Sequence, residues 1–442
     1  MRYFITFIIC VALITMSSCR KDFSTIPSFG SLEFSKDTVF LDTVFTNIGS
    51  ATYNLKVYNR SKKSITIPKI ALENGTSSNY RLNVDGIPGK EFNDVDILAK
   101  DSIFVFIETT INAGNIVDPL YTDRILFDNG SNQQHVDLVT LVQDANFIYP
   151  GKDPLTMKID SLTIDGEPTS IKGRFLTDTE LTFTKLKPTV IYGYAAVAAN
   201  KTLTIDAGAR IHFHNNSGLI IDNKATLKVN GTLAEKVIFE GDRLEYSFSQ
   251  IPGQWGAIWM RAGSKDNEIH HTKIKNGIIG ILIDSIGSAS TPTLKLQNTE
   301  IYNHSNYGIL ARETNIEAHN VVVGSAGEAS FAATIGGTYN FTHSTFANFW
   351  NNNFFTYQDE TGQNIIETRD LHAANFTNCI FDGNNNIEFV LDKVDGGGIF
   401  NYNISNCMIQ FNDTGNSFTE NTELDFTSSF YQNIILNGNS NF

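Results

Sequence analysis

The sequence predicts an all-β protein whose second half is built from stacked parallel strands. The first observation is a six-residue pattern, apolar at its first and last positions and Asn or His at its third, which occurs six times. The six matches span residues 269–274, 296–301, 318–323, 341–346, 376–381 and 404–409. Their polar positions are His271, Asn298, Asn320, His343, Asn378 and Asn406. Repeats of this length are typical of stacked structural units.

The second observation is that the residues in this pattern favour strands over helices. The apolar residues do not recur every three and four positions, as a helical face requires. Most of them are β-branched or aromatic, which suits a pleated sheet. Stacked rungs of strands bury a continuous core that one rung alone cannot bury. The six Asn and His side chains would form a ladder of hydrogen bonds along one corner of the stack, in which Asn298, Asn320, Asn378 and Asn406 are expected to be buried.

Upstream of these copies, short apolar runs with Gly, Asn or Asp after them continue the pattern in looser form. They contain the segments TLTIDAGARIHF, LKVNGT and GQWGAIWM. With the six copies, these segments resemble the right-handed parallel β-helix of the pectin-lyase-like superfold, over residues 186–442. The resemblance implies the fold and not one activity, because this superfold hosts many functions.

Residues 31–145 form a separate predicted domain. Seven or so short strand-like runs are separated by polar turns, which indicates an antiparallel β-sandwich. Leu55 and Val57, or Phe104 and Phe106, are expected to face its core. The stretch KDTVFLDTVFTNIGSATYNLKVYNRS resembles the immunoglobulin-like modules that precede β-helices in bacterial surface lipoproteins. Residues 146–185, with several Pro and Gly, are expected to be a connector with a strand or two.

The N-terminus indicates an exported, lipid-anchored protein. Residues 1–18 have a positive charge, a short apolar run and small residues at the end, which is typical of a signal peptide. Cys19 directly follows Ser17 and Ser18, and this resembles a bacterial lipobox in which Cys19 is lipidated. Residues 19–30 would be a tether. The alternative is an ordinary signal peptide. We therefore expect an outer-membrane protein, surface-exposed or facing the periplasm.

The charge of the chain limits its possible partners, and its cysteines limit disulfides and metal sites. Asp and Glu number 47 against 33 Lys and Arg, a net charge of −14, which disfavours nucleic acid and polyanionic sugars. Cys379 and Cys407 share one repeat position, so they are expected to stack as packed thiols, with a disulfide as the alternative. No spacing of Cys and His predicts a metal site, and no cofactor is expected.

Motifs for catalysis are absent from the sequence. The resemblance implies clustered acidic Ca²⁺ ligands with a basic residue for a lyase, or paired Asp with Gly-His-Gly for a polygalacturonase. The chain has neither an Asp-Asp pair nor Gly-His-Gly. The acidic candidates that remain are Asp266 with Glu268, Asp395, and Asp359 with Glu360, each of which also fits a solvated corner. His270 and His271 cannot point to one site, because successive strand residues face opposite sides.

An aromatic cluster is the strongest candidate for ligand contact. The gap between the copies at His343 and Asn378 is the longest, so the extra residues are expected to leave the stack as a loop. Trp350, Phe355, Tyr357 and Asp359 lie there and could contact a sugar, although the aromatics could instead fill the core. Trp255 and Trp259 alternate on one strand and fit either core or edge.

These observations favour a lipid-anchored envelope protein in which a sandwich holds a β-helix away from the membrane. We expect a non-catalytic binding or scaffold module, for glycans or surface partners. The alternative is a polysaccharide lyase or glycoside hydrolase of the same superfold.

The run 430–436 predicts a final rung with an exposed edge, and edge strands promote self-association.

Overall fold

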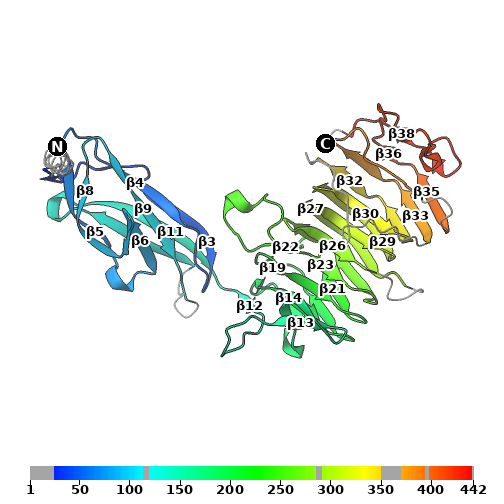
Figure 1. Cartoon of the computed structure of the whole chain (residues 1–442), viewed down its shortest axis with the longest axis horizontal. Coiled ribbons are helices and arrows are strands. Elements are labelled where there is room, and N and C mark those ends of the chain that lie inside the picture. Colours follow the sequence, from blue (N-terminus) through cyan, green and yellow to red (C-terminus); the bar gives the residue numbers. More distant parts are fainter. Residues whose placement is uncertain (1–23, 113–118, 285–290, 350–369, 394–397, 441–442) are drawn as a thin grey trace, which may run out of the picture. The chain divides into compact units, whose positions relative to one another are not determined.

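A computed structural model describes residues 24–112, 119–284, 291–349, 370–393 and 398–440 (Figure 1). It contains two compact units, Met1–Gln143 and Asp144–Phe442. Nearly all regular structure is β-strand, with short 3-10 turns at Gly75–Ser77, Gly130–Asn132, Asp178–Glu180, Tyr246–Phe248 and Thr422–Leu424. The all-β class predicted from the sequence is therefore confirmed.

The first unit is a sandwich of two sheets around one apolar core. The first sheet contains β1 (Ile26–Pro27), β3 (Thr38–Phe45), β5 (Ile65–Leu72), β8 (Glu91–Ile97), β10 (Leu120–Phe127) and β11 (Gln134–Gln143). The second contains β2 (Glu33–Phe34), β4 (Tyr53–Tyr58), β6 (Tyr80–Val84), β7 (Ile87–Gly89) and β9 (Ser102–Thr109). Most neighbouring strands are antiparallel, whereas β3 pairs with β11 in parallel.

One side of strand β9 was assigned wrongly from the sequence. Leu55 and Val57 are buried as expected, but Phe104 and Phe106 are 45% and 41% exposed. The strand is apolar at every position from 103 to 107, so alternation does not tell its two faces apart. The branched residues Val105 and Ile107 take the core side. The two phenylalanine rings lie outside, with their centroids 6.0 Å apart.

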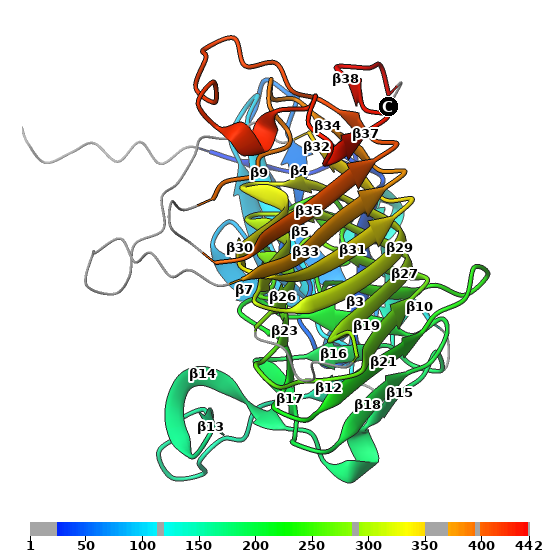
Figure 2. The same ribbon diagram turned by 90° about the vertical axis from the view of Figure 1, so that its right-hand side faces the viewer.

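The second unit is a coil of strands with three faces, in which strands pair in parallel with the equivalent strand of the next turn, apart from one antiparallel hairpin at its start (Figure 2). The first face has β15 (Thr182–Phe183), β18 (Thr202–Ile205), β21 (Thr226–Asn230), β24 (Asn267–His270), the starts of β27 (Leu294–His304) and β29 (Asn315–Ala326), β31 (Gly337–Thr342), β33 (Leu371–Thr377), β35 (Phe400–Ser405) and β37 (Tyr431–Gln432). This arrangement is a parallel β-helix, as the sequence predicts.

The other two faces complete each turn of the coil. The second face has β12 (Asn146–Ile148), β16 (Thr189–Ile191), β19 (Arg210–Phe213), β22 (Val237–Gly241), β25 (Thr272–Lys275), the ends of β27 and β29, β32 (Thr345–Asn348), β34 (Ile380–Gly383), β36 (Met408–Ile409) and β38 (Ile435–Leu436). The third face has β13 (Ser161–Ile164), β14 (Glu167–Phe175), β17 (Tyr194–Val197), β20 (Gly218–Ile221), β23 (Ile258–Met260), β26 (Ile279–Ile283), β28 (Tyr307–Arg312) and β30 (Ala329–Ile335).

Residues 146–185, expected to be a connector, contribute strands to all three faces. β12 and β15 begin the second and first faces, and the hairpin β13–β14 begins the third. Leu162 and Ile164 of this hairpin pack against Ala196 and Ile220 on the outer side of the third face. The segment therefore covers the first turns of the coil.

The repeated Asn and His positions form the corner between the first and second faces. All six have left-handed backbone, with φ between 44° and 56°, which Asn adopts more readily than other side chains with a Cβ. The amide Nδ2 of Asn320 donates to Asn298 Oδ1 at 2.7 Å, and Asn298 Nδ2 lies 3.2 Å from His271 Nε2. Asn378 and His343 are similarly linked at 3.0 Å.

The expected burial of this ladder is wrong. Asn320, His343, Asn378 and Asn406 are exposed, and His271 and Asn298 are half-buried. The side chains that point inward are those two residues before each corner and directly after it, such as Ala318 and Val321, so the left-handed corner residue between them turns its side chain outward. Asn433 extends the ladder by one rung, and its Nδ2 donates to Asn406 Oδ1 at 2.9 Å.

A second row of asparagines is the buried one. Asn276 and Asn303 lie five residues after His271 and Asn298, and both are less than a tenth exposed. Asn303 Nδ2 donates to Asn276 Oδ1 at 2.7 Å. The constant offset of five residues was visible in the sequence, but the Asn-rich composition concealed it.

The interior of the coil changes in composition along its length. The first turns bury aliphatic residues such as Ile205, Leu227 and Val229. Within the described residues the third face ends at β30, and the turns beyond it bury phenylalanines. Phe341 and Phe376 stack with centroids 5.4 Å apart, and Phe346 and Phe381 stack at 5.0 Å.

Cys379 and Cys407 are free thiols, 1% exposed, on neighbouring rungs. The backbone N–H of Cys379 donates to Cys407 Sγ at 3.4 Å. Their hydrogen bonding to each other and their burial raise the pKa of the Cys379 thiol. The expectation of two packed thiols therefore describes the structure, and the disulfide alternative does not.

The last rung is only partly open. Ile435 and Leu436 of β38 are 62% and 43% exposed. Asn437 exchanges two hydrogen bonds with the backbone of Phe411, and Ser440 reaches back to Asp382. Self-association through this edge stays a prediction.

Candidate functional site

The predicted contact residues Trp350, Phe355, Tyr357 and Asp359 lie outside the described residues, as does Asp395. Glu360 and Cys19 also lie outside the described residues, and the remaining candidates belong to separate places in the described part of the chain.

The acidic pair at the start of β24 does not form an open site. Glu268 Oε1 lies 3.1 Å from Lys228 Nζ, and Asp266 Oδ1 accepts a hydrogen bond from Thr291. Partial burial opposes ionisation of Glu268, but the hydrogen bond from Lys228 and the positive charges around the carboxyl together outweigh it, so its pKa is lowered. His270 lies 3.7 Å from Glu268 on the outer surface. These residues make a charged row along the first face.

The two tryptophans have different roles. Trp255 is fully buried, and its Nε1 donates to the Lys275 carbonyl at 2.9 Å. Trp259 is half-buried on the outside of the third face, where its Nε1 donates to Asp284 at 2.7 Å. Trp255 therefore belongs to the core and Trp259 to the surface.

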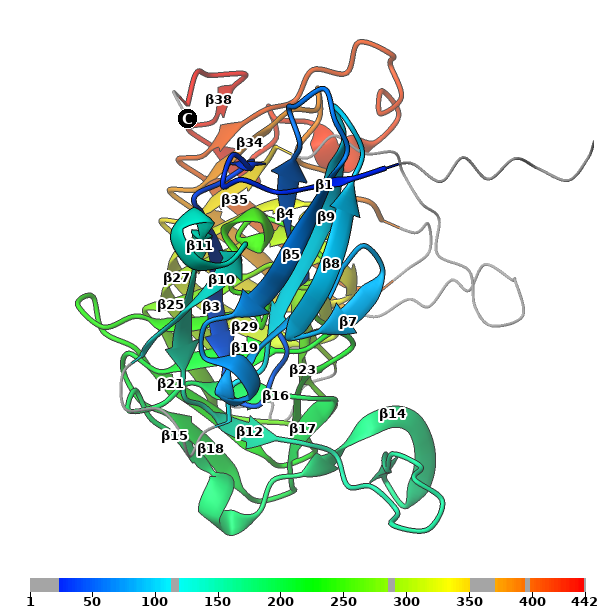
Figure 3. The same cartoon turned by 90° about the vertical axis from the view of Figure 1, so that its left-hand side faces the viewer.

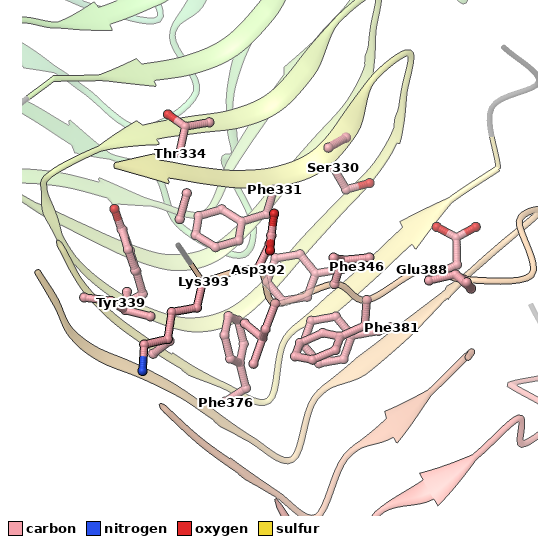
Figure 4. Close-up of a pocket in the computed structure, with 18 of the residues that line it drawn as sticks. Ser330, Phe331, Thr334, Tyr339, Phe346, Phe376, Phe381, Glu388, Asp392 and Lys393 are labelled. Atoms are coloured by element: carbon pink, nitrogen blue, oxygen red, sulfur yellow. The ribbon is translucent and has the colours of Figure 1, made fainter. Parts of the chain in front are cut away.

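A cavity opens beside β30, the last described strand of the third face. We call it the phenylalanine cavity; its volume is about 890 Å³. Phe331, Phe346, Phe376 and Phe381 form its floor, and residues 385–393 form another wall. Figure 4 shows Glu388 and Lys393 on opposite sides of the group of rings.

Glu388 has the most distinctive electrostatics in this cavity. Burial raises its pKa to about 7 from an ordinary value near 4.5, and the nearby charge of Asp382 adds to the shift. The backbone N–H of Asn385 donates to Glu388 Oε1 at 2.7 Å and opposes the shift without cancelling it. A carboxyl with such a pKa exchanges protons near neutral pH, as a general acid does.

A second cavity, of about 630 Å³, lies beside the first turns of the coil. We call it the tyrosine cavity. Its lining residues are Tyr149, Pro150, Lys152, Ile159, Ser170, Ile171, Lys172, Tyr192, Gly193, Tyr194, His214, Asn215 and Asn216. Figure 3 shows β12, β16 and the hairpin ending in β14, which carry or flank these residues.

The positions of the aromatic rings in this cavity follow from the register of the repeated strands. Ile148, Ile191 and Phe213 are paired positions at the ends of β12, β16 and β19. The residues that follow them, Tyr149, Tyr192 and His214, therefore leave the second face one above another.

The three rings form a continuous aromatic row. Tyr149 and Tyr192 have centroids 4.9 Å apart, and Tyr192 and His214 stack at 4.2 Å. The carboxylate of Asp242, whose side chain is 8% exposed, lies 2.8 Å from His214 Nδ1 and fixes the imidazole. Burial raises the pKa of Tyr149 and of Tyr192, so both phenols are neutral at physiological pH.

This row was missed from the sequence. The signal was an aromatic residue after each strand and before a turn residue, as in Tyr149-Pro150, Tyr192-Gly193 and His214-Asn215. The copies lie in the loosely repeating part of the chain and partly in the segment interpreted as a connector, so their alignment became visible only with the strand register.

Two features are absent from the described residues. None of the described helices is long and apolar enough to cross a membrane. No group of three or more His, Cys, Asp or Glu side chains in the described ranges could hold a metal ion.

Comparison with known proteins does not place the chain in a family. No family model and no curated protein matches it. Among solved structures, a family 123 glycoside hydrolase from Clostridium perfringens is similar over 26% of this chain and 27% of its own length, with 11% identity and a TM-score of 0.19. The chain thus spans about a quarter of that protein.

The catalytic unit of a GH87 alpha-1,3-glucanase from Streptomyces thermodiastaticus is similar over 80% of this chain and 83% of its own length, with 9% identity and a TM-score of 0.17. Likenesses at this level do not assign an activity. The fold itself defines the class of the second unit as a parallel β-helix.

Proposed function

We propose that this chain is a glycan-binding protein of the bacterial cell envelope. Cys19 would carry the lipid anchor, and an immunoglobulin-like sandwich would hold a right-handed β-helix away from the membrane. The handedness follows the strong general preference of parallel crossovers. The parallel pairing of β3 with β11 and the two-sheet arrangement support the immunoglobulin-like assignment.

The aromatic row beside the tyrosine cavity is the observation that carries this proposal. Aromatic rings offer rigid apolar surfaces with a polar edge, and the C–H faces of a sugar ring pack on such surfaces. Ser170, Asn215 and Asn216 supply hydroxyl and amide groups on the same cavity lining, suited to sugar hydroxyls. Concave sites with apolar walls and a few polar groups are the usual form of small-ligand sites.

A glycan array tests the binding. The mature chain from residue 20, without its lipid, is applied beside a Tyr192→Ala variant and a Tyr246→Ala control, whose ring is 87% exposed and outside the cavity. We expect the control to bind like the parent and Tyr192→Ala to lose about fivefold to thirtyfold in affinity, since removing the middle ring breaks the aromatic row and costs about 1–2 kcal/mol of binding. Equal binding by Tyr192→Ala would reject this site, and a blank array would reject the function.

The anchor is tested separately from the ligand. Changing Cys19 to Ser should abolish lipidation and move the protein to the soluble fraction of the cell. A Cys10→Ser change should leave its membrane association unchanged, because Cys10 lies within the signal. A Cys19→Ser protein that stays with membranes after a carbonate wash would exclude the lipobox.

A second candidate function is cleavage of a glycan in the phenylalanine cavity. Glu388, with its raised pKa, and Asp392 both line that cavity, and paired carboxyls perform acid–base chemistry in glycosidases. A release assay on the array-positive sugars tests it. Release of reducing ends that Glu388→Gln abolishes would establish catalysis, whereas no release by the parent would leave binding as the function.

A further inference from the structure

The tyrosine cavity has a charge opposite to that of the chain. Its lining includes Lys152 and Lys172 and no carboxylate. The whole sequence carries a net charge of −14. The lining itself is therefore cationic, and the nearest carboxylates lie behind it, Asp160 beside Gly151 and Asp242 against His214.

Basic residues close to this cavity in the fold are neutralised, but these two are not. Arg174 pairs with Glu180 at 2.6 Å, and Lys187 pairs with Asp144 at 2.5 Å. Lys172 Nζ donates to Ser161 Oγ at 2.9 Å and to the Ile159 carbonyl at 3.4 Å, which are neutral acceptors. Among the described residues, neither Lys152 nor Lys172 forms an ion pair. Their charge is available to a ligand.

The local strand pairing brings the two lysines together. Lys152 bridges to Ile159, and Lys172 pairs with Ser161 across the hairpin β13–β14. Both lysines therefore come from the segment 152–172, while the aromatic row comes from the ends of β12, β16 and β19. The cavity combines a cationic wall with an aromatic wall.

We propose that the tyrosine cavity selects a saccharide unit bearing an acidic group, either a carboxylate or a sulfate. The sugar ring packs on the tyrosines, and the acidic group lies against Lys152 and Lys172. This inference rests on the proposed glycan binding and adds the class of ligand. Lysine suits such a group because its ammonium is a compact charge with three donors.

The two lysines attract an acidic group only at this cavity, whereas the net negative charge of the chain repels anions elsewhere. A long polyanion would be repelled by the net charge of the chain, whereas a single acidic unit, or a chain end, places its charge at the lysines. We therefore expect short acidic oligosaccharides to bind better than long uniform polyanions at low salt.

Calorimetric titration tests the inference with three matched probes: a neutral oligosaccharide, its uronate counterpart and a sulfated form. The variants are Lys152→Gln/Lys172→Gln and a control, Lys62→Gln/Lys63→Gln, which removes the same charge from exposed positions of the first unit. All four lysines are exposed, and thermal melts verify that each variant folds.

We expect at least one acidic probe to bind about fivefold to tenfold more tightly than the neutral one, as two exposed ion pairs allow. The cavity variant should lose that difference, and the control should keep it. Raising the salt from about 50 to about 500 mM should also weaken binding of the acidic probe, because salt screens the attraction between its charge and the two lysines. Preference for the uronate or for the sulfated form identifies the acidic group.

Two other outcomes overturn the inference and differ from each other. Equal binding of neutral and acidic probes, sensitive to Tyr192→Ala but not to the lysine changes, rejects acid selection and leaves glycan binding intact. Absence of binding by all three probes rejects both proposals for this cavity.

Discussion

The two ends of the β-helix use aromatic side chains in different ways. Beside the first turns, Tyr149, Tyr192 and His214 lie on the outside, and the interior is mostly aliphatic, with a few buried rings such as Phe213 and Trp255. Beyond β30 the rings lie inside, where Phe341 and Phe376 stack above one another. Within the described residues, the third face is present in the first region and has ended in the second.

This difference separates buried rings that support the fold from outer rings that a ligand can reach. Around the first turns, mostly aliphatic side chains and a few rings fill the interior, and a further row of rings lies outside. Beyond β30, phenylalanines pack inside, beside a cavity of about 890 Å³. Aromatic residues in the two regions should therefore differ in their effect on stability and on binding.

The largest expected effect is on the stability of the second region. Phe376→Ala removes a ring that is 4% exposed and stacked on Phe341, so we expect a loss of about 3–5 kcal/mol in the free energy of unfolding. Tyr192→Ala, on the outside, should cost no more than about 1–2 kcal/mol. Urea titration measures both. Equal losses would remove the distinction between inner and outer rings.

The two asparagine rows give the next largest difference. Asn303→Leu leaves buried Asn276 without its 2.7 Å partner, and the unsatisfied group costs about 1–3 kcal/mol. Asn320→Leu affects an exposed ladder, so its cost should be near the strain of a branched residue at positive φ, about 1–2 kcal/mol. Both positions have positive φ, so the strain cancels when the two variants are compared. Thermal melts that rank Asn320→Leu as the more damaging change would contradict the assignment of inner and outer rows.

The smallest effect is the pH dependence that Glu388 confers on the phenylalanine cavity. Its pKa is about 7 in the folded chain and near 4.5 when unfolded, so the folded state binds more protons between these values. Stability from this group therefore falls as the pH rises from about 4.5 to about 7. Glu388→Gln should remove that fall, and its stability relative to the parent should rise by about 1–3 kcal/mol over this window. If the difference in stability between Glu388→Gln and the parent does not change with pH, Glu388 is exposed to water and its pKa is not raised.

The sequence predicted the features that the backbone repeats and missed those that depend on how turns stack. Each corner of the ladder needs a left-handed residue, so Asn and His recur there, and their spacing alone is enough to indicate the parallel coil. Whether a corner side chain points inward depends on the turn, and Asn320 was therefore expected inside when it lies outside. The lysines of the tyrosine cavity meet the rings only through the register of the first strands.

The stacked thiols of Cys379 and Cys407 give the coil a built-in reporter of its own opening. In the mature chain without Cys19 they are the remaining cysteines, and both are sealed between rungs. A thiol reagent can reach them only when neighbouring rungs separate, so the labelling rate measures how often this part of the coil opens under native conditions. The two cysteines lie in the turns beyond β30, so their labelling follows the fluctuations of the part of the coil whose interior is built from phenylalanines.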